Sequence, residues 1–171
     1  VCSAVLTGIA PTYEWDNCDY DVTYSISGAT TATGTDDASG ETFNVGVSTV
    51  TYEIEDEAGN TASCFFYVEV EDTELPVVTN CPSDQTVGMD FYVCSADVDI
   101  THPDASDNCG TLTMDLLVTF ADGSTNTFSD VTPGDMQTLM DLGKGTHTLL
   151  YTITDAAGNV ETCTYTITVE D

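Results

Sequence analysis

The chain has 171 residues, of which 30 are acidic and one, Lys144, is basic, giving a formal net charge of −29. Because binding to nucleic acids and anionic membranes depends on lysine and arginine, this composition excludes both as partners. No apolar run approaches the roughly 20 residues of a membrane-spanning helix. Hydrophobic residues make up 41% of the chain and alternate with polar ones, which favours a folded β protein over disorder.

The first elements of the chain return later in it. The sequence Val-Cys-Ser-Ala at residues 1–4 recurs at residues 93–96, and Asp-Asn-Cys at residues 16–18 recurs at residues 107–109. A longer segment, residues 50–60, recurs as residues 149–159, and both copies close with Asp-x-Ala-Gly-Asn. Self-similarity at a fixed period indicates a tandem array of small domains.

The register of this repeat predicts the domain boundaries. Both copies end in Glu-Asp, so we expect one domain at residues 1–72 and another at residues 73–171. Because Val1 matches Val93, the first domain has no counterpart of residues 73–92. We therefore predict that the first domain is truncated and lacks its first strand, whereas the second is complete.

The strands are predicted from alternation with a period of two. Val50, Tyr52 and Ile54 face one way in the first copy, and the matching residues in the second copy are Leu149, Tyr151 and Ile153. The last strand of each copy shows the same pattern, with inward residues Cys64, Phe66, Val68 and Val70 and then Cys163, Tyr165, Ile167 and Val169. Short half-buried strands in units of about one hundred residues predict an all-β protein of tandem immunoglobulin-like β-sandwiches.

Seven cysteines in a β-rich chain indicate an oxidising, extracellular setting. A zinc site requires close pairs such as Cys-x2-Cys, and none is present. The second domain holds four cysteines, which allow three pairings. A free catalytic thiol is not favoured, because no histidine accompanies the cysteines of the first domain.

The second domain resembles the hyalin repeat, or HYR, family. The resemblance rests on Asn80-Cys81-Pro82, then Cys94, the Asp-Asn-Cys element and Asp-x-Ala-Gly-Asn followed by Cys163. It implies immunoglobulin-like, extracellular adhesion domains strung in arrays, as in surface proteins of Bacteroidetes-like bacteria. Two stretches depart from the family pattern. A usual Gly-Ser-x-Phe-Pro-x-Gly segment is reduced at residues 40–46 and replaced by a longer one around residues 132–143.

The resemblance also implies a disulfide pattern. Family members with two cysteines keep those matching Cys81 and Cys163, so these two are expected to pair. Cys94 would then pair with Cys109 and Cys2 with Cys18, leaving Cys64 to bond a missing upstream cysteine. A rival scheme pairs Cys81 with Cys94 and Cys109 with Cys163.

A cation site is predicted where acidic loops converge. In a sandwich of this topology, the loop after the second strand, the loop before the last strand and the interdomain linker lie at the same end. Calcium takes six to eight such oxygen ligands, and an all-oxygen set disfavours zinc or copper. The candidate ligands are Glu71, Asp72, Glu74, Asp104, Asp107, Asn108, Asp155 and Asn159, with Glu14, Asp16, Asn17, Asp56 and Asn60 as counterparts in the first domain.

Two alternatives to calcium remain open at this point. Asp-Asn and Ala-Gly-Asn are also ordinary turn sequences, since asparagine and glycine tolerate positive φ and aspartate caps its own backbone. The acidic surface could then be offset by high external salt.

The sequence favours a structural role over catalysis. His102 and His147 lack a matching nucleophile and do not recur in the other domain, so the chain is not expected to be an enzyme. We predict an extracellular stalk or filament repeat of a cell-surface adhesin, whose partners are neighbouring repeats of the same polypeptide. The alternative is a glycan- or protein-binding module, with Trp15 as the contact; packing against a neighbouring unit or loop is the plainer explanation for Trp15. The first strand of the first domain could also be supplied by another chain, but a fragment boundary explains its absence more simply.

Overall fold

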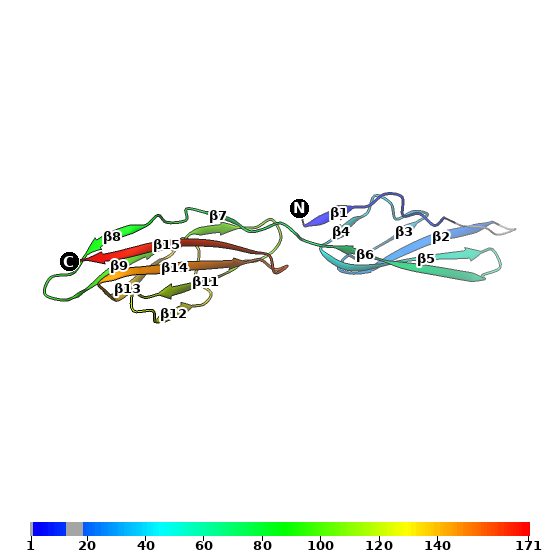
Figure 1. Ribbon diagram of the computed structural model, residues 1–171. Coiled ribbons are helices and arrows are strands. Elements are labelled where there is room, and N and C mark those ends of the chain that lie inside the picture. Colours follow the sequence, from blue (N-terminus) through cyan, green and yellow to red (C-terminus); the bar gives the residue numbers. More distant parts are fainter. Residues whose placement is uncertain (1, 13–18) are drawn as a thin grey trace. The chain divides into compact units, whose positions relative to one another are not determined.

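The protein is described from a computed structural model, over residues 2–12 and 19–171. The chain divides into two compact units, Val1–Asp72 (unit 1) and Thr73–Asp171 (unit 2), and each is described by itself (Figure 1). Every regular element of the described residues is a β-strand. Within these residues there is no helix with the length and apolar character needed to cross a membrane.

Unit 2 is built from one five-stranded sheet and two short pairs of strands. The five-stranded sheet has the order β12 (Thr125–Phe128), β11 (Thr113–Thr119), β14 (Gly145–Thr154), β15 (Val160–Glu170) and β8 (Gln85–Gly88). The first pair is β13 (Met136–Gly143) with β9 (Ser95–Thr101), and the second is β10 (Asp104–Ser106) with β7 (Val77–Thr79).

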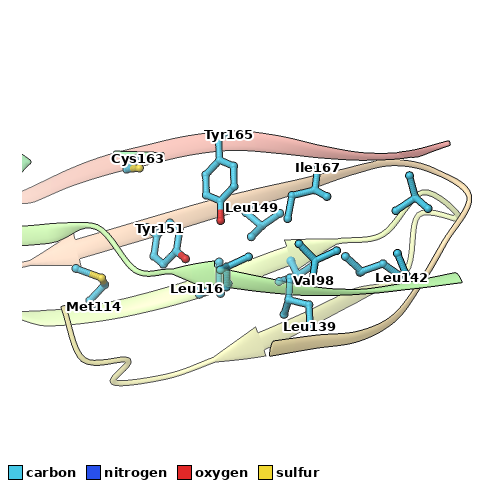
Figure 2. Packing of buried hydrophobic residues seen from close by; sticks show 14 of the residues in the cluster. Val98, Met114, Leu116, Leu139, Leu142, Leu149, Tyr151, Cys163, Tyr165 and Ile167 are labelled. Carbon is cyan, nitrogen blue, oxygen red and sulfur yellow. The ribbon is translucent and has the colours of Figure 1, made fainter. Parts of the chain in front are cut away.

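The core of unit 2 lies between these layers. Val98 and Leu139 of the β9–β13 pair pack in one cluster with Leu116, Leu149 and Ile167 of the large sheet (Figure 2). Leu116, Leu149 and Ile167 are completely buried. Burial of each such side chain contributes about 1.5–3 kcal/mol relative to leaving it exposed, so packing across the sandwich is the main stabilising term.

The edge of the large sheet shows that the fold is immunoglobulin-like. β8 pairs with β15 in parallel, although all other strand pairs of this sheet are antiparallel. Cys81, four residues before β8, forms a disulfide with Cys163 of β15, with their Cα atoms 5.9 Å apart. A first strand that crosses from one layer to lie parallel to the last strand is typical of such sandwiches. The predicted fold class is confirmed.

Unit 1 repeats the central sheet of unit 2. Its four-stranded sheet has the order β3 (Ala32–Thr35), β2 (Tyr20–Gly28), β5 (Gly46–Asp56) and β6 (Thr61–Val70), and a separate pair joins β1 (Ser3–Val5) to β4 (Thr42–Asn44). The Tyr52 hydroxyl donates to the Ile9 carbonyl at 2.9 Å and accepts from the Ala38 amide at 3.0 Å. Tyr52 thereby fastens two loops to the core.

The predicted strand faces are confirmed in unit 2 and only partly observed in unit 1. Leu149, Tyr151 and Ile153 are completely buried, and so, within 3%, are the inward residues of β15, namely Cys163, Tyr165, Ile167 and Val169. In β6 only Val68 is buried, and Cys64 is exposed. The departure at residues 132–143 becomes β13, which pairs with β9 through a register shift between Leu139 and Leu142.

Candidate functional site

The loop that follows β10 forms the centre of the candidate cation site. Asp107 Oδ1 accepts a hydrogen bond from the Cys109 amide at 2.6 Å, a short turn that fixes the carboxylate beside its own backbone. The neighbouring Asn108 donates its side-chain amide to a carboxylate oxygen of Glu74. The contact between Asn108 and Glu74 thus holds the loop that contains Asp107 next to the segment that begins unit 2.

Two carboxylates come close together here. One ligand atom from each of Asp72, Asp107 and Cys109 lies within 4.8 Å of the other two. Cys109 is disulfide-bonded, so its sulfur is not a thiolate ligand and the available donors are oxygens. A shallow hollow of about 320 Å³ adjoins the loop and is lined in part by Glu74, Asp107 and Asn108.

Other predicted ligands point elsewhere. Asp104 lies at the opposite end of β10 from Asp107, and its Oδ2 accepts from the Asn80 side-chain amide at 2.7 Å. Three steps along the chain, at about 3.3 Å each, separate the Cα atoms of the two aspartates by roughly 10 Å. Glu71 is exposed, and no cluster of three potential ligands among the described residues includes it.

Asp155 and Asn159 are hydrogen-bonded to each other across the turn between β14 and β15. Asp155 Oδ1 accepts from the amides of Ala157 at 2.9 Å and Asn159 at 2.8 Å, and Oδ2 accepts from the Asn159 side chain at 2.8 Å. Gly158 between them has φ +92°, a conformation that glycine adopts without strain. The turn alternative therefore accounts for this motif, and the Asp155 carboxylate is already occupied by three hydrogen bonds.

The same turn is built in unit 1. Asp56 Oδ1 accepts from the amides of Ala58 at 2.9 Å and Asn60 at 2.8 Å, and Oδ2 accepts from the Asn60 side chain at 2.7 Å. The side-chain and backbone hydrogen bonds from Asn60 lower the pKa of Asp56. At Asp155, burial acts to raise the pKa, but hydrogen bonds led by that of Asn159 outweigh it and lower the pKa.

The two loops predicted to converge do lie side by side in unit 2. A Cβ placed on Gly110, just after the Asp-Asn-Cys element, would lie 3.0 Å from the Cβ of Ala156 in the β14–β15 turn. The loops thus meet, but the side chain of Asp155 is directed into its own turn. The candidate ligands Glu14, Asp16 and Asn17, together with Trp15, lie outside the described residues.

The disulfide prediction is confirmed at one pair and wrong at another. Cys81 bonds Cys163 as expected, which excludes the rival scheme. The predicted bond from Cys94 to Cys109 is not formed, because Cys94 is an exposed free thiol. The physical reason is distance. Cys94 precedes the seven-residue strand β9 and Cys109 follows its far end, so the strand separates them by roughly 20 Å.

The remaining cysteines belong to unit 1. Cys2 is disulfide-bonded, but its predicted partner Cys18 lies outside the described residues, so that pair stays a prediction. Cys64 is an exposed free thiol.

Both histidines are core residues. His102 is 5% exposed and its Nδ1 lies 3.0 Å from the Tyr151 hydroxyl. Burial lowers the pKa of His102, against a smaller opposing effect of Asp135. His147 is 2% exposed, and its Nε2 lies 2.7 Å from the Gly143 carbonyl oxygen. Neither imidazole is presented to solvent.

Sequence reasoning overlooked two exposed aromatic pairs. Phe91 and Tyr92 stand almost fully exposed in the turn between β8 and β9. Phe65 and Tyr67 lie on the outward face of β6, 63% and 67% exposed, with ring centroids 5.8 Å apart. The sequence could have shown that Phe65 and Tyr67 are unusual, because the matching outward residues of β15 are Thr164 and Thr166.

Comparison with known proteins identifies the family. The chain matches the HYR domain twice, over residues 9–70 and residues 71–169. This chain belongs to the HYR domain family. It is 29% identical to hyalin of Strongylocentrotus purpuratus over 94% of the chain and 13% of that protein. It is 34% identical to the sushi, von Willebrand factor type A, EGF and pentraxin domain-containing protein 1 of Mus musculus, over 75% of the chain and 3% of that protein.

A second hyalin and one solved structure are also similar to this chain. Hyalin of Lytechinus variegatus is 33% identical over 76% of the HYR chain and 22% of its own length. The chain therefore spans less than a quarter of each of these relatives. Among solved structures, the fibronectin(III)-like modules of Clostridium thermocellum CbhA match with 18% identity and a TM-score of 0.44, covering 93% of this chain and 82% of that one.

Proposed function

We propose that this chain is a structural repeat of an extracellular cell-surface adhesin, a stalk or filament module that sets reach and does not itself carry the tip ligand. The observation that carries the proposal is repetition. Units 1 and 2 share the central sheet and the same Asp-x-Ala-Gly-Asn turn with matching hydrogen bonds. The exposed aromatics of β6, in contrast, do not recur, because Phe65 and Tyr67 match Thr164 and Thr166 in β15. A structural role depends on features that every repeat shares, whereas a specific binding site depends on residues that occur in one repeat.

The setting of the module follows from its covalent chemistry. The Cys81–Cys163 disulfide supports an oxidising, extracellular location. Neighbouring repeats of the same polypeptide are the proposed partners. A bacterial surface protein as the source stays a prediction, since the relatives named above come from sea urchins and mouse.

We propose calcium as the cofactor, held by Asp72 and Asp107 with Glu74 and Asn108 beside them. Three features support this assignment: the close approach of Asp72 to Asp107, the oxygen-only donor set, and a net charge of −29 that needs an opposing cation. Calcium bound by these residues would restrain the segment that leads into unit 2. The disulfides and the ion together would stiffen the array.

A calcium titration of the chelator-treated full chain tests this proposal, with heat of binding and melting temperature followed together. Calcium at about one hundred times its dissociation constant stabilises the folded state by about 2.7 kcal/mol, and we expect the melting temperature of unit 2 to rise accordingly. Asp107→Asn should remove the heat. Asp21→Asn, which deletes the same charge from an exposed position on β2, is the matched control and should retain it. A response that sodium chloride of equal ionic strength reproduces would contradict a calcium site and favour the saline-habitat alternative.

A binding module remains the second candidate, and the exposed aromatics favour it. Phe91 and Tyr92 project from a turn fixed by the hydrogen bonds from the Met89 amide to Glu170 O and from the Asp90 amide to Ser95 O. Exposed aromatic rings can stack on sugars or on a partner protein. A glycan-binding measurement with the chain and its Phe91→Ser/Tyr92→Ser variant separates the two candidates. Binding that this variant loses would support the second.

A further inference from the structure

Strand β6 of unit 1 carries two aromatic side chains on its solvent-facing side. Phe65 and Tyr67 are 63% and 67% exposed, and their ring centroids lie 5.8 Å apart. Because successive side chains of a strand point to opposite faces, both rings lie on the outer face of the sheet, away from the core. The matching residues of β15 are Thr164 and Thr166, so unit 2 has no such pair at these positions.

The exposure of this outer face does not depend on the strand beside β6. In unit 2, β8 lies next to β15 in the plane of the sheet, and Thr164, the counterpart of Phe65, is exposed nevertheless. A strand that pairs along an edge extends the sheet sideways and leaves its outer face in solvent. Phe65 and Tyr67 are therefore open to a partner whether or not β6 has a second neighbour.

The shape of the aromatic pair favours cationic side chains over a sugar as the ligand. The two ring planes are inclined by 73°, so they do not form one flat platform on which successive sugar rings could stack. The residues opposite the rings in β5 are Thr51 and Thr49, which are half-buried. A lysine or arginine side chain needs only one ring face, within about 6 Å of the ring centroid. Each of the two rings can therefore hold one such group.

Two carboxylates flank the rings on the same face. Glu69 lies two residues beyond Tyr67 in β6, and Glu53 of β5 lies diagonally across from Phe65, at a separation of about 7–8 Å that long side chains can bridge. Both glutamates are exposed. The one basic residue of the chain, Lys144, forms its ion pair within unit 2. A partner of this face must therefore bring the positive charge itself.

We propose that the outer face of β5 and β6 in unit 1 is a docking site for an extended, arginine- and lysine-rich segment of a partner protein. Alternate residues of an extended segment lie on one side, so two basic side chains can reach Phe65 and Tyr67 while Glu53 and Glu69 accept their hydrogen bonds. The net charge of −29 attracts such a segment over a distance and repels a second copy of this chain. The site goes beyond the stalk proposal, because it gives the module a partner of its own and does not require calcium.

Titration of the full chain, in the presence of a chelator, with a short peptide in which arginine and threonine alternate tests this proposal. The same peptide with citrulline in place of arginine is the control, because citrulline keeps the shape of the side chain and lacks its charge. Phe65→Thr/Tyr67→Thr introduces the residues found at the matching positions of β15, so the melting temperature of unit 1 should stay unchanged. Loss of two exposed cation–π contacts should weaken binding of the arginine peptide about fivefold to thirtyfold.

The carboxylates are tested by a second pair of variants. Glu53→Gln/Glu69→Gln should weaken binding more than Glu57→Gln/Glu170→Gln, which removes the same charge from exposed positions away from the rings. Equal effects of the two variants would show that net charge alone attracts the peptide, and would overturn the proposal. Equal affinity of Phe65→Thr/Tyr67→Thr and the unaltered chain would do the same.

A map of the amide chemical shifts locates the bound peptide without any substitution. Adding the arginine peptide should shift the amides of residues 49–53 and 65–69, and the citrulline peptide should leave them in place. Shifts confined to unit 2, no binding at low salt, or equal binding of the two peptides would overturn the proposal. A neutral oligosaccharide such as cellohexaose that shifts these amides when the arginine peptide does not would identify a glycan site instead, and would also overturn it.

Discussion

Removing the Cys81–Cys163 disulfide should destabilise unit 2 strongly and leave unit 1 unchanged. The two cysteines are separated by 82 residues in sequence, and on the chain-entropy model closing such a loop contributes about 4.5 kcal/mol. For a domain of this size, that corresponds to a fall in melting temperature of roughly 20 to 30 °C. Cys81→Ala/Cys163→Ala is preferred over serine, because Cys163 is buried and a hydroxyl there would have to find a partner.

Scanning calorimetry of the full chain measures this effect, with hydrogen exchange assigning each transition to its unit. Cys64→Ala/Cys94→Ala is the matched control, since both thiols are free and exposed, and it should leave the melting temperature of unit 2 unchanged. A fall of less than about 3 °C for Cys81→Ala/Cys163→Ala, or an equal fall for the control, would refute the reasoning, because 1 kcal/mol alone shifts such a domain by 4 to 8 °C.

Three further outcomes are expected. Burial lowers the pKa of His102 below its ordinary value of 6.5, so the unfolded state binds more protons and unit 2 should lose stability as pH falls below about 6.5. When the free energy of unfolding is measured by denaturation between pH 7 and pH 5, it should change less steeply with pH for His102→Gln than for the unaltered chain. An unchanged pH dependence would contradict this. The pKa of Asp155 is lowered from 3.8, so its stabilising effect is present above that value and is lost as pH falls through the lowered pKa. Asp155→Asn should therefore destabilise unit 2 at pH 7 more than at pH 3, and equal effects would count against the charged turn. Finally, maleimide labelling of the native chain followed by peptide mapping should modify Cys64 and Cys94 and spare Cys163, and a labelled Cys163 would disprove the bridge.

The strands were predictable because their pattern is local. Alternation at Leu149, Tyr151 and Ile153 depends only on the pleat of one strand, and all three side chains are completely buried. The same pattern in β6 predicted burial of Cys64 as well. That prediction was wrong in the described residues because burial there requires a second strand, and a strand's own sequence does not say whether its neighbour is present.

The turns of the site were predictable because their residues are close in sequence. The Asp-x-Ala-Gly-Asn turns follow from five consecutive residues, and both copies form the same hydrogen bonds. The Cys94–Cys109 pairing failed because it depends on the path of β9, which carries the chain from one end of unit 2 to the other. The separation of Asp104 from Asp107 was missed for a similar reason, since it depends on β10, which begins at one residue and ends just before the other.

The measurement that tests the stalk proposal most directly is the spread of distances between the two units in solution. Spin labels on the free thiols Cys64 and Cys94 place one probe on each unit. Pulsed electron–electron double resonance then reports the distribution of distances between the two labels. If calcium stiffens the array, the distribution should narrow when calcium is added and stay broad for Asp107→Asn. The same width with and without calcium would contradict a cation-stiffened stalk.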